Sequence, residues 1–244
     1  MRRSTASHEI QVSGIPIEIV RKDIKNLHPS VMPPNGRVRV SVPKHLNDDR
    51  VRAAVVTKLD WIRKRQRVME AQPRQTQREM VEGESHYFMG KRYRLEVVER
   101  YGKHKIELKT GAKLQLFVSP DTTAANRRLV LNEWYREQLK AQIPLLLIKW
   151  EAIVKRHAND WGVKKMKTRW GSCNITQKRV WLNLELAKKP PECLEYVLVH
   201  ELVHLHERYH NDRFKQLMTK FLPNWESSRK LLNQGPLGHD DWDC

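Results

Sequence analysis

The stretch VLVHELVHLHERYH, residues 197–210, places four histidines and two glutamates among apolar side chains. With LEY at residues 194–196 before it, the run is apolar on nearly every side, which predicts a helix buried on most faces. A buried imidazole or carboxyl is costly to desolvate unless it has a partner. The rest of the fold must therefore supply one, and a bound metal ion is the partner that this residue pattern favours.

His200 and His204 are four residues apart, which on a helix places their Cβ atoms about 5–6 Å apart on one face. Two imidazoles at this spacing can share a metal ion. Glu201 is rotated by about 100° from His200, so it does not complete the same ligand set. It can instead act on a metal-activated water as a general base. The competing interpretation, two core histidines satisfied by hydrogen bonds, does not explain the carboxylate between them.

A catalytic zinc ion normally has three protein ligands and one open position. Three residues are candidates for the third ligand: His206, Glu207 and His210. His206 lies on roughly the opposite helix face. Glu207 continues the row of His200 and His204, and three ligands in one row cannot surround a tetrahedral ion. We expect His210, because Asn211 can cap a following helix and a turn lets His210 approach from another direction.

The run HELVHLHERYHNDRF, residues 200–214, follows TRWGSCNITQKRVWLNLELAKKPPECLEYVLV, residues 168–199. Together they closely resemble the YgjP-like metallopeptidase domain family, relatives of the SprT-like zinc proteases. The resemblance extends over essentially the whole chain, from IEIVRKDIKNL at residues 17–27 to FLPNW at residues 221–225. W-G-S-C, the H-E-x-x-H motif and the third histidine all sit at the family's spacing.

This resemblance implies a Zn²⁺ ion held by His200, His204 and His210, with Glu201 as general base. The histidine spacing equals that of the metzincins, but Glu207 replaces their glycine, so we do not expect a metzincin turn. The expected fold is α+β: a β-rich N-terminal module followed by a zincin-like, α-rich domain with a β-hairpin beside the H-E-x-x-H helix.

Other residues near the motif have open roles. The candidates for stabilising an oxyanion, or for supporting the metal ligands, are Arg169, His206 and Tyr209. The hairpin expected over residues 165–186 could present an edge strand to an extended peptide. We interpret Cys173 as a packing residue rather than a nucleophile, because no separate base-orienting set accompanies it. The tail GHDDWDC, residues 238–244, is read as a frayed acidic end.

Two modules are expected along the chain, a mostly β module over residues 1–120 and the metal-binding catalytic domain over residues 121–244. Alternating residues and Asn35-Gly36 predict a hairpin over residues 15–43. A basic helix is expected at about 48–71, further hairpins turn at Gly90 and Gly111, and Pro144 kinks or breaks a long helix. No internal repeat is evident.

The composition describes a folded protein with a heavily charged surface, 39% hydrophobic and 30% charged. Its net charge of +18 predicts attraction to polyanions such as nucleic acid, although a basic helix is also often just a solvated face. The three cysteines are odd in number and form no C-x-x-C pair, so neither a disulfide framework nor a thiolate zinc site is indicated, which fits a reducing compartment. We expect a cytoplasmic protein without a membrane span.

Three functions are compatible with these features. The first is a zinc-dependent hydrolase of the zincin type, in particular a metallopeptidase acting on peptide or protein. The second is a metal-dependent nucleoside triphosphate pyrophosphatase or phosphohydrolase, which the basic composition suits although no G-x-x-x-x-G-K-[ST] loop is present. The third is a DNA-associated zinc protein of SprT-like type. The pattern leaves the substrate, the oligomeric state and the role of the N-terminal module open.

Overall fold

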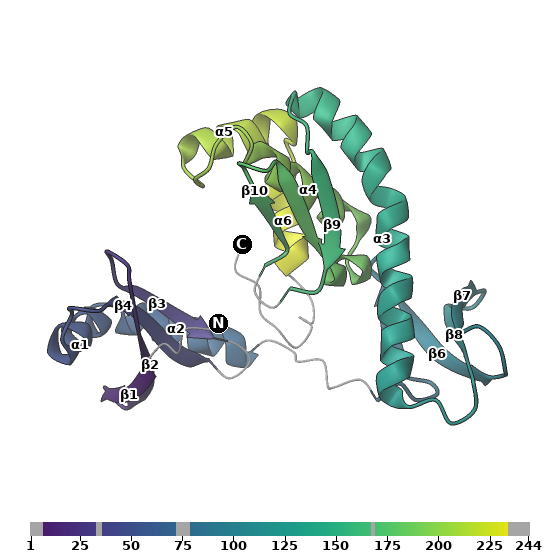
Figure 1. Ribbon diagram of the computed structural model, residues 1–244, viewed down its shortest axis with the longest axis horizontal. Coiled ribbons are helices and arrows are strands. Elements are labelled where there is room, and N and C mark those ends of the chain that lie inside the picture. Colours follow the sequence, from purple (N-terminus) through teal and green to yellow (C-terminus); the bar gives the residue numbers. More distant parts are fainter. Residues whose placement is uncertain (1–6, 33–35, 72–78, 167–168, 234–244) are drawn as a thin grey trace. The chain divides into compact units, whose positions relative to one another are not determined.

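The computed structural model describes residues 7–32, 36–71, 79–166 and 169–233. Helices and sheets mix as expected for an α+β protein, and the chain forms two compact units that divide near residue 75 (Figure 1). We expected a boundary at residue 120. The strands between residues 85 and 118 instead belong to the same unit as the histidine-bearing helix. Asn35 and the tail 238–244 lie outside the described residues.

The first unit is a four-stranded sheet with two helices. Its strands have the order β1-β2-β4-β3. The elements are β1 (Ser7–Val12), β2 (Ile15–Lys22), β3 (His28–Met32), β4 (Arg37–Pro43), α1 (Asp48–Val56) and α2 (Leu59–Ala71). The alternating apolar residues of the strands meet one stripe of the helices in a common core, which includes Ile17, Ile19, Val38, Val40, Val51, Val55 and Ile62.

Two expectations for this unit are corrected. Strands β2 and β4 pair in parallel, with Ile17 opposite Val38, and are therefore not a hairpin. Each forms its hairpin with a neighbour that sequence patterning did not identify, β2 with β1 and β4 with β3. The basic segment is two helices, because the chain turns at Thr57, whose hydroxyl donates to the Ala54 carbonyl and competes with the helical bonds.

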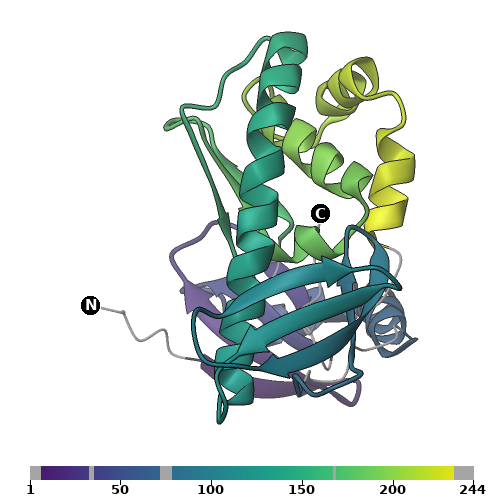
Figure 2. The ribbon, with the colours of Figure 1, turned by 90° about the vertical axis from the view of Figure 1, so that its right-hand side faces the viewer.

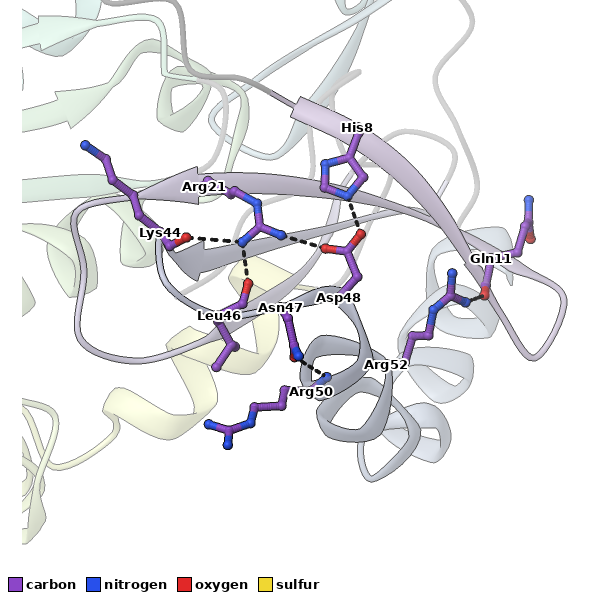
Figure 3. Close-up of polar contacts among 9 residues, drawn as sticks. All are labelled: His8, Gln11, Arg21, Lys44, Leu46, Asn47, Asp48, Arg50 and Arg52. Carbon is purple, nitrogen blue, oxygen red and sulfur yellow. Dashed lines mark hydrogen bonds and ion pairs between the residues drawn. The ribbon is translucent and has the colours of Figure 1, made fainter.

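A polar network fastens the start of α1 to the sheet (Figure 3). Asp48 accepts from the Arg21 guanidinium at 2.6 Å and lies 2.8 Å from His8 Nε2. Arg21 also donates to the Leu46 carbonyl, and Asn47 caps the helix by accepting from the Arg50 amide. The His8 hydrogen bond and the nearby cations lower the pKa of Asp48. Part of the basic surplus of this unit is thus used to hold its own helix.

The second unit begins with another four-stranded sheet and a long helix. The elements are β5 (Ser85–Phe88), β6 (Lys91–Glu99), β7 (Lys105–Lys109), β8 (Lys113–Val118) and α3 (Ala124–Val154). The hairpins expected at Gly90 and Gly111 are confirmed. Helix α3 begins at the Thr123 cap and continues past Pro144 without a break.

The two four-stranded sheets have the same topology, so the chain contains a structural repeat that its sequence did not reveal. The second sheet has the order β5-β6-β8-β7, with a parallel pair at its centre and an antiparallel hairpin on each side, as in the first. The first hairpin turns at Ser13-Gly14 in one copy and at Met89-Gly90 in the other, and all four residues have positive φ. A helix follows the last strand of both copies.

The remainder of the second unit is a three-stranded sheet packed with helices. Its elements are β9 (Asp160–Lys164), β10 (Gly171–Asn174), β11 (Arg179–Asn183), the 3-10 helix η1 (Leu184–Lys188), α4 (Pro191–Val203), α5 (Asp212–Phe221) and α6 (Trp225–Asn233). The expected hairpin is confirmed as β10 with β11, and β9 pairs in parallel with β11. Figures 1 and 2 show α3 running from the β5–β8 sheet to this part of the unit.

Main-chain hydrogen bonds join the β5–β6 turn to η1, which directly precedes the histidine-bearing helix α4. The amides of Met89 and Gly90 donate to the carbonyls of Ala187 and Lys188, at 2.9 and 3.2 Å. A Cβ on Gly90 would lie 2.8 Å from Cγ of Pro190, the cap residue of α4. These contacts explain why β5–β8 belong to this unit rather than to an N-terminal domain.

Replacing Gly90 by alanine should test this junction. Gly90 and Gly111 both have φ of +74°, but among the described residues no atom lies within 4 Å of a Cβ built at Gly111. Both variants incur left-handed backbone strain, whereas Gly90→Ala also clashes with Pro190. We expect Gly90→Ala to lower the free energy of unfolding by about 1–3 kcal/mol more than Gly111→Ala, measured by urea denaturation. Equal losses would contradict the proposed junction.

Candidate metal centre

Three histidines from two neighbouring segments converge at the end of α4. His200 lies in the last turn of the helix, His204 caps it, and His210 stands one residue before the cap of α5. One ring nitrogen from each lies within 4.8 Å of the others. The Nε2 atoms of His200 and His210 are 2.9 Å apart. The two histidines at helical spacing and the turn histidine are thus brought together as expected.

Local hydrogen bonds hold this arrangement. His204 Nδ1 lies 3.1 Å from the Glu207 carbonyl, so a proton on Nδ1 leaves Nε2 free to face a ligand. Asn211 caps α5 by accepting from the Phe214 amide at 3.0 Å. The Phe214 ring in turn contacts all three imidazoles, with centroid distances of 4.8–4.9 Å. The cap and the aromatic ring therefore fix the turn that carries His210.

Burial keeps the three imidazoles neutral. It lowers the pKa of His200 to about 3, with smaller contributions from the charges of the other two histidines and of Arg229. The pKa values of His204 and His210 are lowered as well, mainly by desolvation. Neutral imidazole is the form that binds a metal ion. Three such nitrogens within a few ångströms fit the first shell of a divalent ion such as zinc.

Glu201 occupies a separate, fully packed position beside this cluster. Its side chain is buried, and desolvation raises its pKa to about 8 although the positive charge of Arg169 opposes the shift. The carboxyl lies against Gly171 at the start of β10. A Cβ at Gly171 would lie only 2.5 Å from Glu201 Oε1 and 2.9 Å from Val197 Cγ1. The glycine of W-G-S-C is therefore needed to make room for the carboxylate.

The other residues that we singled out lie outside the histidine cluster. His206 donates from Nε2 to the Val154 carbonyl at 2.7 Å and stacks on Phe221, so it ties the segment after α4 to α3. Tyr209 is 66% exposed, and its ring lies beneath the Arg208 guanidinium. Arg169 is exposed and close enough to act electrostatically on Glu201.

Burial disfavours the thiolate form of Cys173 and Cys193. Cys173 and Cys193 are free, and burial raises their pKa to about 12 and about 11, the charge of Glu201 adding to the shift at Cys173. A thiol rather than a thiolate is present at neutral pH, which agrees with the packing role expected for Cys173.

Sequence patterning missed three residues around the cluster: Gly171, Phe214 and Arg229. The close approach of Gly171 to Glu201 depends on how β10 packs against α4, which local patterning does not reveal. Phe214 lies on the buried face of α5, where its spacing alone does not reveal its contact with three imidazoles. Arg229 gave no signal at all, because it belongs to a separate helix almost twenty residues after the motif.

Comparison with known proteins identifies the family of this site. The family model of the YgjP-like metallopeptidase domain matches residues 28–235. A metal cofactor and a hydrolytic activity accompany that family. No curated protein matches the chain. One solved structure, the metallopeptidase zymogen abylysin of Pyrococcus abyssi, is 21% identical over 36% of this chain and 87% of its own, with a TM-score of 0.33. A similarity of that size supports no further conclusion.

Replacing Gly171 by alanine should displace the Glu201 carboxyl. The added Cβ meets Glu201 and Val197 below 3 Å, so we expect a loss of about 1–3 kcal/mol in stability and a loss of hydrolytic activity, with metal content unchanged. Gly162→Ala is a matched control, since its Cβ would lie 2.4 Å from Trp181 in the same sheet. It should lose stability but keep activity. Full activity in Gly171→Ala would show that the carboxyl position does not matter.

In the metal-free protein, the free energy of unfolding should show the destabilising effect of burying Glu201. In the metal-free protein the pKa of Glu201 is raised from 4.5 to about 8. Between pH 4.5 and pH 8, Glu201 therefore holds a proton in the native state that it has lost in the unfolded state. The contribution of Glu201 to stability therefore decreases as pH rises, by about 1.4 kcal/mol per pH unit. The stability of Glu201→Gln relative to wild type should increase from pH 5 to pH 8 in urea denaturation with a chelator. A constant difference would contradict the burial of an ionisable carboxyl.

Proposed function

We propose, on the premise that this chain belongs to the YgjP-like metallopeptidase family, that it is a zinc-dependent peptidase in which Glu201 is the general base. The observation that carries the proposal is the convergence of three neutral imidazoles next to the buried Glu201 carboxyl, which is not part of the histidine cluster. His200, His204 and His210 would hold the ion. The zincin-like arrangement implied by the resemblance is part of this proposal.

A zinc ion held by these imidazoles would supply Lewis-acid chemistry, activating water and polarising the scissile carbonyl. Glu201 would take the proton of the attacking water at its carboxylate and pass it to the leaving nitrogen. A positive charge at the cluster favours the ionised carboxylate, and the charge of Arg169 acts in the same direction. Gly171 would leave room for the carboxyl beside β10 during this transfer.

We propose that an extended peptide substrate binds at the edge of the three-stranded sheet. Strand β10 is an outer strand in the order β10-β11-β9, and its first residue lies against Glu201. A peptide pairing with β10 would gain main-chain hydrogen bonds and pass close to the base. This is the role that we expected for the hairpin of residues 165–186.

Nucleoside triphosphate hydrolysis remains the second candidate. The observation that favours it is positive charge on two sides of the cluster, from Arg169 beside Glu201 and from Arg229 beside His200. Phosphates would be attracted to both. The DNA-associated alternative has no comparable support: residues such as Lys58 and Arg63 are exposed, as any solvated helix face would be. None of the described helices has the length and apolar character needed to cross a membrane.

Purified protein should bind zinc and cleave unfolded protein, and two variants should separate binding from chemistry. We expect His210→Ala to lose zinc affinity, because only two imidazoles remain. Glu201→Gln should keep zinc and lose activity by about 100-fold or more, as for the loss of a general base. Zinc is measured by metal analysis and cleavage by peptide release.

His157→Gln is the matched control for the histidine variant. His157 is an exposed histidine paired with Glu151, away from the cluster. It should leave zinc content and cleavage unchanged. Zinc-loaded protein that releases phosphate from nucleoside triphosphates but cleaves no polypeptide would favour the second candidate, and zinc binding unaffected by His210→Ala would refute the ligand set.

A further inference from the structure

A series of aromatic contacts connects helix α6 to the histidine cluster. The buried Trp225 stacks on Tyr196 of α4, with centroids 6.4 Å apart and planes at 13°. Tyr196 meets the ring of His200 edge-on at 5.8 Å. Trp225 also donates through its indole nitrogen to the Thr219 hydroxyl at 3.1 Å. The first turn of α6 is therefore held at a fixed place near the first histidine.

Arg229 is four residues after Trp225 and so shares its face of α6. Long side chains on a helix point back toward its N-terminus, which places the guanidinium over the turn of Trp225. Tyr196, on which Trp225 stacks, borders His200 on this side. The charge of Arg229 lowers the pKa of both His200 and His210, which agrees with this position.

The guanidinium of Arg229 is available for binding. The side chain is exposed, and over the described ranges no hydrogen bond or ion pair reaches it. Some arginines of this unit are matched with carboxylates, for example Arg127 with Glu99 at 3.2 Å and Arg179 with Asp160 at 2.6 Å. Arg229 differs from them in lying beside residues that would hold a divalent cation.

A fixed cation next to a metal site is electrostatically unfavourable unless an anion offsets it. Repulsion from Arg229 would weaken metal binding in the absence of substrate. The same charge becomes favourable when an oxyanion binds between the guanidinium and the ion. Arginine suits that task, since its planar fork donates two parallel hydrogen bonds to a carboxylate or phosphate.

We propose that Arg229 forms a subsite for an oxyanionic group of the substrate, a carboxylate or a phosphate, next to the bond that is hydrolysed. This inference rests on the proposed hydrolase function and names the chemistry of its substrate. A peptidase with this subsite would prefer peptides whose free carboxylate lies close to the cleaved bond. A nucleotide hydrolase would use it for a phosphate beside the one attacked.

The test begins with anion binding, which does not depend on turnover. Inorganic phosphate is titrated calorimetrically into the zinc-loaded full chain of wild type, Arg229→Gln, Arg229→Lys and Lys230→Gln. We expect Arg229→Gln to weaken phosphate binding by about tenfold or more, the usual loss of a charge-assisted hydrogen bond, and Arg229→Lys to weaken it less. Lys230→Gln removes an exposed charge from the next position of α6 and should bind as wild type does. Equal phosphate affinity in wild type and Arg229→Gln would overturn the inference.

Turnover then distinguishes the source of the oxyanion. The substrates are two peptides that differ only in a free or amidated C-terminus, and a nucleoside triphosphate. A rise in KM of Arg229→Gln for the free-acid peptide alone supports a carboxylate, and a rise for the triphosphate supports a phosphate. Unchanged kinetics of Arg229→Gln on every substrate that wild type hydrolyses would refute the subsite while leaving the proposed function intact.

The two hypotheses can fail separately. Zinc-loaded wild type that hydrolyses none of these substrates would argue against the proposed function, and the phosphate titration would still decide the subsite. Zinc affinity gives a second readout: it should increase in Arg229→Gln, because the repulsive charge is gone, and should not change in Lys230→Gln. Circular dichroism confirms that the variants are folded.

Discussion

The desolvation of ionisable side chains on α4 is the constraint on which this unit depends. The helix is buried on most sides, yet it carries two imidazoles and a carboxyl in its last turns. The neighbouring elements enclose these groups, and a hydrogen bond to one imidazole offsets part of the cost. Strand β10 presents a glycine to the carboxyl, α5 places an aromatic ring against the imidazoles, and the Glu207 carbonyl orients one of them. A bound cation would supply the remainder.

Local signals predicted the parts of the structure that depend on neighbouring residues. The spacing of His200 and His204 and the Asn211 cap each act within a few positions of the chain, and each has the expected structure. The Gly90 and Gly111 hairpins are of the same kind. The metal-binding role of the three histidines remains a prediction, whereas their convergence is observed.

Non-local pairing explains what patterning missed. Alternation in β2 and β4 was correctly recognised as strand, but alternation does not specify a partner, and the parallel pair joins strands that have β3 between them in the sequence. The same applies to β9, which pairs with β11 across the intervening β10. The division near residue 75 depends on main-chain bonds between residues almost a hundred positions apart, Met89 and Ala187.

The shared topology of the two four-stranded sheets is what tandem duplication of an ancestral segment would produce. The two turns are under unequal structural constraints. In the second, the Met89-Gly90 turn is bonded to η1 and abuts Pro190, so both its backbone angle and its bulk are restricted. In the first, no atom of the described residues comes within 4 Å of a Cβ at Gly14, so only the angle is restricted. Sequence drift and insertions should therefore accumulate at the first turn, leaving that copy free to acquire a role of its own.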